Sequence, residues 1–308
     1  MTNRRKPNHE NRRCSELGED LVLEKLLGRI HRRSDSVVLG AGDDCAVVRR
    51  LRPDHLLLLK TDCLVEGIHF SARTPPAQVG WKAMARPLSD FAAMSGLPQF
   101  ALVTLIVPGS KKLAWVDGVY RGLLQVGNRF DVAIVGGETS ATRGPVVLSI
   151  SVAGSVEKAR WVSRSGGEVD DELFVTGRLG GAIRGKHLRF IPRIEEARWL
   201  TRNFSIHAMM DLSDGLGTDL PRLARASRLG FELDRKAIPR TAGCSLREAL
   251  TGGEDYELLF AVSSRGGVRL PERWRKRFPR LPLTRIGRLK AEGGSSISRL
   301  PRGYVHFQ

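Results

Sequence analysis

Short apolar runs bounded by Gly, Asp and Pro alternate along the chain with segments of helical periodicity. The runs HLLLLKTD, ALVTLIVPG, DVAIVGG and PVVLSISVAGSV predict strands in the first half, and ELFVTGRL, FELD and LLFAV predict strands in the second. Intervening segments such as KKLAWVDGVYRGLLQVGNRF and DGLGTDLPRLARASRLG space their apolar residues as helices do. This alternation predicts an α/β (α+β) protein, with mixed sheets flanked by helices.

The 308 residues are enough for two domains. The polar, Gly-bearing segment EKARWVSRSGGEVDD separates the two groups of predicted strands. We therefore expect a basic N-terminal tail over residues 1–15, an N-terminal domain over 16–158 and a C-terminal domain over 159–308. Within the helical segment VGWKAMARPLSDFAAMSG, Pro87 should start a turn or a kink.

The balance of charges limits the class of partner. Fifty Lys and Arg residues against 33 Asp and Glu residues give a net charge of +17, which favours nucleic acid, acidic membranes or phosphorylated small molecules. No run approaches the roughly 20 apolar residues that a membrane span needs. The four cysteines lie far apart and form no CxxC pair. These features predict a cytoplasmic protein that has reduced cysteines and no membrane partner.

Two glycine-rich stretches resemble phosphate-binding loops only in part. GAGDDC begins like a dinucleotide fingerprint, but Cys45 stands where the last glycine is needed, and the strand-like run CAVV follows. GGAIRGKH matches the spacing GxxxxGK but has His187 where the motif needs Ser or Thr to bind magnesium. We predict that the second stretch is a Gly-rich turn.

Carboxylates at the tips of apolar elements are the stronger signal. An isolated anion in such a place costs several kcal/mol unless it is paired or bound to a cation. One of them alone would be a helix cap or a turn residue, but the arrangement recurs. Oxygen ligands without a His or Cys cluster indicate magnesium, which usually binds together with substrate phosphates. The carboxylates are Asp62, Asp90, Glu138, Asp211 and Asp214.

Eight motifs together resemble the thiamine-monophosphate kinase family, part of a superfamily with aminoimidazole ribonucleotide synthetase and selenophosphate synthetase. The motifs are GAGDDCAVV, TDCLVEGIHF, ARPLSDFAAM, VGGETSATRGP, HLRFIPR, DLSDGLGTDL, GGEDYELLF and RGYVHF. The resemblance implies a two-domain aminoimidazole ribonucleotide synthetase-like fold and a homodimer formed through the N-terminal domains. It also implies ATP and several Mg²⁺ ions between the domains, and phosphorylation of thiamine monophosphate to thiamine diphosphate.

The resemblance assigns roles to single positions. It implies metal ligands at Asp44, Thr61, Asp62, Asp90, Glu138, Asp211 and Asp214. Among these, the catalytic positions are Asp44, Asp62, Asp90 and Asp211. It implies ATP contacts at Gly137, Glu138, Arg164 and Ser213, and thiamine monophosphate contacts at His69, Glu254 and Tyr304. The acceptor is a phosphate oxygen that is ionised near neutral pH, so catalysis rests on positioning and electrostatics and needs no general base.

The chain departs from the family pattern in three places. Glu138 stands where the family usually has Asp, and Lys60 stands where a small hydroxyl residue often adds a ligand. The segment between Gly181 and HLRFIPR is shorter than usual. Two alternatives stay open: a divergent superfamily member with another phosphorylated substrate, and a nucleic-acid-binding protein, suggested by ERWRKRFPRLPLTRIGRLK. That basic run has few aromatic residues for base stacking, so nucleic acid is the less favoured partner.

Overall fold

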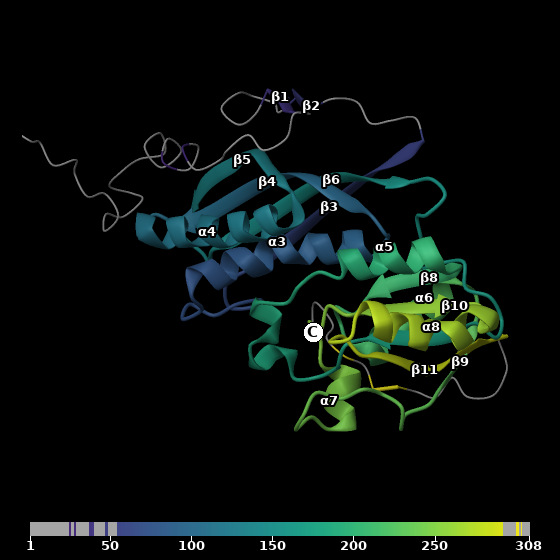
Figure 1. Cartoon of the computed structure of the whole chain (residues 1–308). Coiled ribbons are helices and arrows are strands. Elements are labelled where there is room, and N and C mark those ends of the chain that lie inside the picture. Colours follow the sequence, from purple (N-terminus) through teal and green to yellow (C-terminus); the bar gives the residue numbers. More distant parts are fainter. Residues whose placement is uncertain are drawn as a thin grey trace, which may run out of the picture. The chain divides into compact units, whose positions relative to one another are not determined.

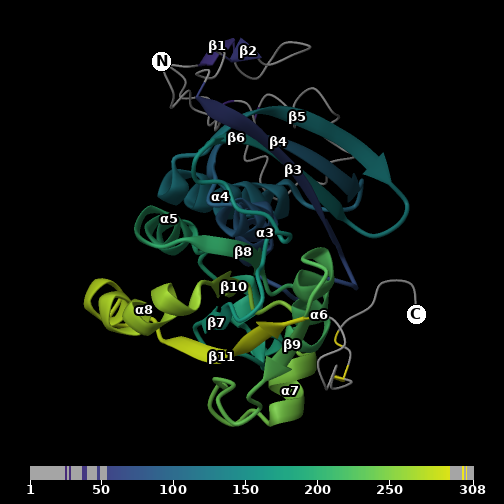
Figure 2. The same cartoon turned by 90° about the vertical axis from the view of Figure 1, so that its right-hand side faces the viewer.

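The computed structural model describes residues 25, 28, 37–39, 47–48, 54–291, 300–301 and 303. The chain divides into two compact units (Figures 1 and 2). The first comprises Met1–Pro53, Leu57–Pro87 and Pro98–Ser155, and the second comprises Asp54–Leu56, Leu88–Leu97 and Val156–Gln308. Each unit combines a sheet with helices, which confirms the predicted α/β class. The predicted domain boundary after residue 158 stays a prediction.

The first unit is built on a four-stranded sheet with the strand order β3-β6-β4-β5. Its strands are β3 (His55–Val65), β4 (Leu97–Pro108), β5 (Ala133–Thr142) and β6 (Val147–Glu157). Strands β4 and β5 are parallel and are connected by helix α4 (Leu113–Phe130). Alternate residues of β6 are buried, including Leu148, Ile150 and Val152, so one face of the sheet forms the core.

Helices α3 (Pro76–Ala93) and α4 lie on the same face of this sheet (Figures 1 and 2). They approach each other closely because glycines lie at their contact. A Cβ atom at Gly80 would lie 1.9 Å from the Val119 carbonyl oxygen, and one at Gly122 would lie 2.0 Å from that of Ala77. Both glycines therefore have a packing function in this helix pair.

Pro87 lies inside α3, and the helix continues beyond it to Ala93. The expected turn at this proline is therefore wrong, whereas the alternative, a kink, stays a prediction. Burial of Met84, Leu88 and Phe91 around it explains the difference, because packing of this helix face stabilises α3 although Pro87 cannot donate a backbone hydrogen bond.

The second unit is built on a five-stranded antiparallel sheet with the order β8-β10-β7-β11-β9. The strands are β7 (Glu172–Thr176), β8 (Ile206–Asp211), β9 (Gly230–Leu233), β10 (Leu258–Val262) and β11 (Leu283–Lys290). Strands β7, β9 and β10 confirm the strands predicted at ELFVTGRL, FELD and LLFAV. Strands β8 and β11 were not predicted as strands.

Among the described residues from 156 onward, the second unit also contains four helices and two 3₁₀ turns. They are α5 (Ile194–Asn203), α6 (Leu216–Ala226), α7 (Leu246–Thr251), α8 (Ser264–Arg277), η1 (Ala182–Arg184) and η2 (Lys186–Leu188). Apolar residues of α6 and α7 pack with the sheet in one core that includes Leu220, Leu250 and Leu259. Trp274 of α8 is buried, and its ring lies edge-on to that of Trp199 in α5, with the centroids 5.9 Å apart.

Two short strands precede the first unit's sheet. Strand β1 (Val37–Leu39) pairs antiparallel with β2 (Val47–Val48), which lies in the strand-like run CAVV. Within the described part of the chain, every helix is too short or too polar to cross a lipid bilayer.

Candidate functional site

The end of β3 carries two of the predicted metal ligands. The Oγ of Ser151 donates a hydrogen bond to the Thr61 Oγ1 over 3.0 Å, and Ser149 Oγ lies 3.3 Å from the same oxygen. The carboxylate of the next residue, Asp62, lies 3.6 Å from the guanidinium of Arg86 on α3. Successive side chains of a strand point to opposite faces, so the side chains of Thr61 and Asp62 do not face the same ligand.

His69 follows β3 in a turn that the chain holds firmly. The backbone amide of Val65 donates to the His69 Nδ1 over 3.0 Å. The fully buried Lys82 donates from its Nζ to the His69 carbonyl oxygen over 2.7 Å. The position of the imidazole, predicted to contact the substrate, is therefore fixed by its own backbone and by α3.

On β5, Gly137 lies against β4 with no room for a side chain. Its φ is +157°, and a Cβ atom would lie 1.8 Å from the Val103 carbonyl oxygen. The side chain of Glu138, the next residue, is exposed. A carboxylate with access to solvent could contact a nucleotide or its metal, so this geometry is compatible with the predicted role of Glu138.

In the second unit, Asp211 ends β8 and is only 4% exposed. The Oγ of Ser89, in the last turns of α3, donates to its Oδ2 over 2.6 Å. Asp90 follows Ser89 and is half-buried. The predicted ligands Asp90 and Asp211 thus come from segments that a hydrogen bond joins. Sequence reasoning missed Ser89, although it stands beside a predicted ligand.

The loop after β8 contains the predicted positions Ser213 and Asp214 and is hydrogen-bonded to a third, Glu254. The backbone amide of Glu254 donates to the Ser213 carbonyl oxygen over 2.7 Å. The Asp214 carboxylate is paired with Arg222, and the Asp214 amide donates to the buried Asp219 over 2.9 Å. Burial raises the pKa of Asp219 to about 6, although this amide and Arg222 oppose the change. The predicted ATP contact at Ser213 and the predicted substrate contact at Glu254 are therefore adjacent.

Two buried carboxylates next to Glu254 were also missed. Asp255 is 1% exposed and accepts the backbone amide of Gly180 at 2.9 Å. Burial raises its pKa to about 6, against the effects of that amide and of Lys186. For Glu257, burial would raise the pKa, but ion pairs with Arg193 and Lys186 prevail and lower it below its ordinary value. The pattern GGEDYEL, with three acidic residues before an apolar strand, was the available signal.

The stretch GGAIRGKH forms the turns η1 and η2, which confirms that it is a Gly-rich turn. Its first glycine donates to a protein carboxylate, that of Asp255, in place of a phosphate. Arg164 is exposed, and its carbonyl oxygen accepts a hydrogen bond from the Ser227 Oγ over 3.3 Å. Two predicted site residues, Asp44 and Tyr304, lie outside the described residues.

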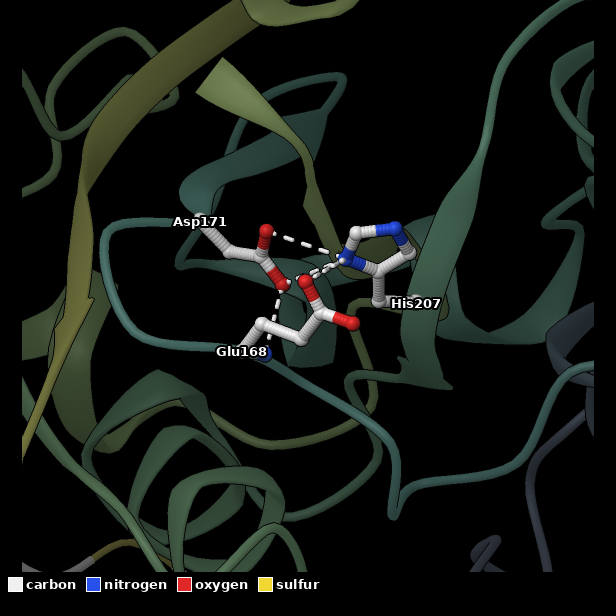
Figure 3. Close-up of side chains that lie close together, drawn as sticks. All are labelled: Glu168, Asp171 and His207. Atoms are coloured by element: carbon white, nitrogen blue, oxygen red, sulfur yellow. Dashed lines mark hydrogen bonds and ion pairs between the residues drawn. The ribbon is translucent and has the colours of Figure 1, made fainter.

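A further group of possible ligands lies at β8 and the turn before β7 (Figure 3). His207 Nδ1 lies 3.0 and 2.9 Å from the two carboxylate oxygens of Asp171 and 3.9 Å from the Glu168 carboxylate. The Glu168 backbone amide also donates to Asp171 over 2.7 Å. These contacts supply hydrogen-bond partners to the buried carboxylate of Asp171. We therefore interpret Asp171 and His207 as a structural pair. Among the described residues of this unit, Asp90, Asp211 and Asp214 do not form such a compact group.

The chain matches two family models, "AIR synthase related protein, N-terminal domain" over residues 42–156 and "AIR synthase related protein, C-terminal domain" over residues 146–297. It is 36% identical to the thiamine-monophosphate kinase of Rhodopirellula baltica, over 94% of this chain and 97% of that protein.

Two solved structures are similar along nearly their whole length. The crystal structure of thiamine-monophosphate kinase from Stenotrophomonas maltophilia K279a has a TM-score of 0.76 and 29% identity, over 89% of this chain and 93% of that one. The structure of AaThiL complexed with AMPPCP and TMP has a TM-score of 0.71 and 29% identity, over 95% and 98%. The two-domain fold implied by the sequence motifs is thereby confirmed. With matches that extend over almost the entire chain, the protein belongs to the thiamine-monophosphate kinase family.

Proposed function

We propose that the chain transfers the γ-phosphoryl group of ATP to thiamine monophosphate, giving thiamine diphosphate and ADP. The observation that carries the proposal is the end-to-end match to thiamine-monophosphate kinases at 36% identity. The complex of a structural relative with AMPPCP, an ATP analogue, and TMP supports both substrates. In this chain, the hydrogen bond between Glu254 and Ser213 brings a proposed acceptor contact next to a proposed nucleotide contact.

We further propose magnesium as the cofactor. The proposed ligands are all oxygen donors: Asp44, Thr61, Asp62, Asp90, Glu138, Asp211 and Asp214. Asp211 suits a cation, because it is a buried carboxylate at the end of a strand, where a bound cation would compensate its charge. When bound, magnesium neutralises the charge on the phosphate oxygens. The carboxylate of Glu138 lies about one bond length further from its backbone than that of an aspartate would. To bind a metal at the same position, the backbone of Glu138 would therefore have to lie further from that metal.

The proposed roles of the chain's residues are to bind and to orient. The two substrates are anions that repel each other, and the attacking phosphate oxygen is already ionised near neutral pH. Arg164 is exposed and carries a positive charge that suits a nucleotide phosphate. Asp62, Asp90 and Asp211 would hold the cations that allow the two phosphates to approach, so charge stabilisation does the catalytic work.

A homodimer formed through the first unit is part of the proposal, as is a cytoplasmic location. On the sheet face opposite α3 and α4, the side chains of Leu57, Leu59 and Leu102 are 57%, 72% and 44% exposed. Thr61 lies on the same face by the two-residue period of β3. Large exposed aliphatic side chains on a sheet are typical of surfaces that another protein covers, and a second copy of this chain is the partner we propose.

The test is to incubate the purified chain with ATP, Mg²⁺ and thiamine monophosphate and to measure products by chromatography. We expect equal amounts of thiamine diphosphate and ADP, with activity abolished by EDTA and restored by Mg²⁺. Asp211→Asn should lower kcat by about 100-fold or more, whereas Asp170→Asn, an exposed control, should not. Phosphorylation of a different phosphorylated acceptor, without thiamine diphosphate, would instead favour a divergent member of the superfamily.

A further inference from the structure

The segment that presents Glu254 has an unusual backbone conformation. Glu254 and Tyr256 have φ values of +65° and +50°, in the left-handed region that residues other than glycine rarely adopt. Their amides donate to the carbonyl oxygens of Ser213 and Leu212 over 2.7 and 2.9 Å. Such backbone persists only where surrounding contacts hold it, and it is found preferentially at functional sites.

A second segment supplies side-chain contacts to the same residues. Three residues spaced three apart in HLRFIPR each meet one residue of EDYE. His187 Nδ1 lies 2.7 Å from the Glu254 Oε2, and the rings of Phe190 and Tyr256 are stacked with centroids 3.9 Å apart. Arg193 makes two hydrogen bonds of 2.8 Å to the Glu257 carboxylate. We call residues 187–193 the clamp segment.

Within the clamp segment, His187 is the residue that contacts Glu254, which is proposed to bind the substrate. The His187 side chain is 7% exposed, whereas that of Glu254 is 20% exposed. The histidine is thus buried behind a carboxylate that retains access to solvent. A hydrogen bond from a buried, rotationally restricted donor fixes the torsions of a glutamate that would otherwise sample several rotamers.

The other clamp contacts have a different effect. Arg193, together with Lys186 just before the clamp segment, neutralises Glu257, whose side chain is 2% exposed, and Phe190 packs on the buried Tyr256. These contacts stabilise the backbone of the strained segment. Of the clamp contacts described above, the one from His187 is the contact to the Glu254 carboxylate. Its removal should therefore change the orientation of this carboxylate before it changes folding.

We propose that His187 is a positioning residue, which fixes the Glu254 carboxylate for contact with thiamine monophosphate. This inference rests on the proposed function. A carboxylate repels the phosphate of this substrate, so Glu254 would meet its cationic, hydrogen-bond-donating ring portion. His187 therefore contributes to recognition of the acceptor and leaves the binding of ATP unchanged.

The test uses two substitutions of nearly equal shape. His187→Asn places an amide nitrogen close to the original Nδ1 and keeps the donor, whereas His187→Leu removes it. We expect His187→Leu to raise KM for thiamine monophosphate by about 10- to 100-fold, and KM for ATP by less than about twofold. His187→Asn should recover most of the loss. In a Glu254→Ala background, His187→Leu should have little further effect, because the two residues act as a unit.

Three results would overturn the positioning role. One is an unchanged KM for thiamine monophosphate in a folded His187→Leu protein. The others are equal increases in both KM values and additive losses in the double variant. If His187→Leu does not fold in a thermal unfolding assay, His187→Ala is compared with His187→Asn in the same way. A wild-type chain that forms no thiamine diphosphate would contradict the proposed function itself, and the positioning role would fall with it.

Discussion

Asp255 is a buried carboxylate that no substrate contact explains. It accepts the amide of Gly180, while Lys186 and Glu257 act on it with opposite charges. Burial dominates and raises its pKa to about 6, compared with an ordinary value of 3.8. Since the folded state holds this proton more tightly than the unfolded state, ionisation of Asp255 disfavours folding.

The raised pKa of Asp255 predicts how the free energy of unfolding changes with pH. The stabilising effect of the protonated Asp255 is fully present below the unfolded pKa and is lost as pH rises through about 6. Between pH 4 and pH 7, the free energy of unfolding of the wild type should fall by about 2 kcal/mol more than that of Asp255→Asn. Urea unfolding at several pH values measures this difference, and Asp131→Asn, at an exposed position, serves as control. Parallel pH profiles for wild type and Asp255→Asn would contradict the raised pKa.

The α3–α4 pair depends on glycines at the helix contact. At Gly122, helix propensity and packing oppose each other: alanine is the better helix former by about 1 kcal/mol, but its methyl group would lie on the Ala77 carbonyl oxygen. The backbone of α3 cannot move aside as a flexible side chain could. Packing therefore decides the effect.

We predict that Gly122→Ala lowers the free energy of unfolding by about 1–3 kcal/mol. The matched control is Gln125→Ala on the exposed face of the same helix, which should change stability by less than about 0.5 kcal/mol. Denaturant unfolding gives both values. A Gly122→Ala protein more stable than wild type would mean that helix propensity prevails and that the two helices do not pack as closely as described.

Strands with continuous apolar runs were predictable because their sequence alone indicates burial. Every residue of β10 is buried, and its run LLFAV is continuously apolar and of strand length. In contrast, α8 has only Gly267, Leu270 and Trp274 buried among many arginines, so its apolar stripe is too narrow to identify from sequence. Strand β11 has arginines at positions 285 and 288 and a glycine at position 287, whose φ is +159°. These residues interrupt the apolar alternation by which a strand is identified from sequence.

The candidate site residues could be proposed from their types and positions in the sequence, but their contact partners could not. Carboxylates after apolar runs stand out in the sequence. The contacts Ser89–Asp211 and His187–Glu254 join residues far apart in the chain, and only the tertiary fold brings them together. No local pattern marks Ser89 or His187 as a partner of these acids.

The whole chain carries a charge of +17, but much of its most basic segment is paired within the second unit. Salt bridges join Lys276 to Glu272, Arg277 to Glu195, Arg285 to Glu172, Arg288 to Glu232 and Lys290 to Asp170. Arg273 lies over the rings of Trp199 and Phe204. A segment whose cations face protein acids offers few phosphate contacts.

We therefore predict weak binding to DNA. In a fluorescence anisotropy titration with random duplex DNA, the slope of log K against log salt concentration should correspond to fewer than about three phosphate contacts. The magnesium-dependent kinase reaction, measured in parallel, verifies that the protein is folded. A slope steeper than about −5 would contradict this reading of the charge and would support the nucleic-acid-binding alternative.

The edge-on pair of Trp199 and Trp274 has a spectroscopic consequence. Two indoles with centroids 5.9 Å apart and planes inclined at 75° have coupled electronic transitions, and such coupling produces a paired positive and negative band in circular dichroism. Both rings belong to the second unit. The native protein therefore contains an intrinsic optical probe that monitors the melting of one half of the chain without any attached dye.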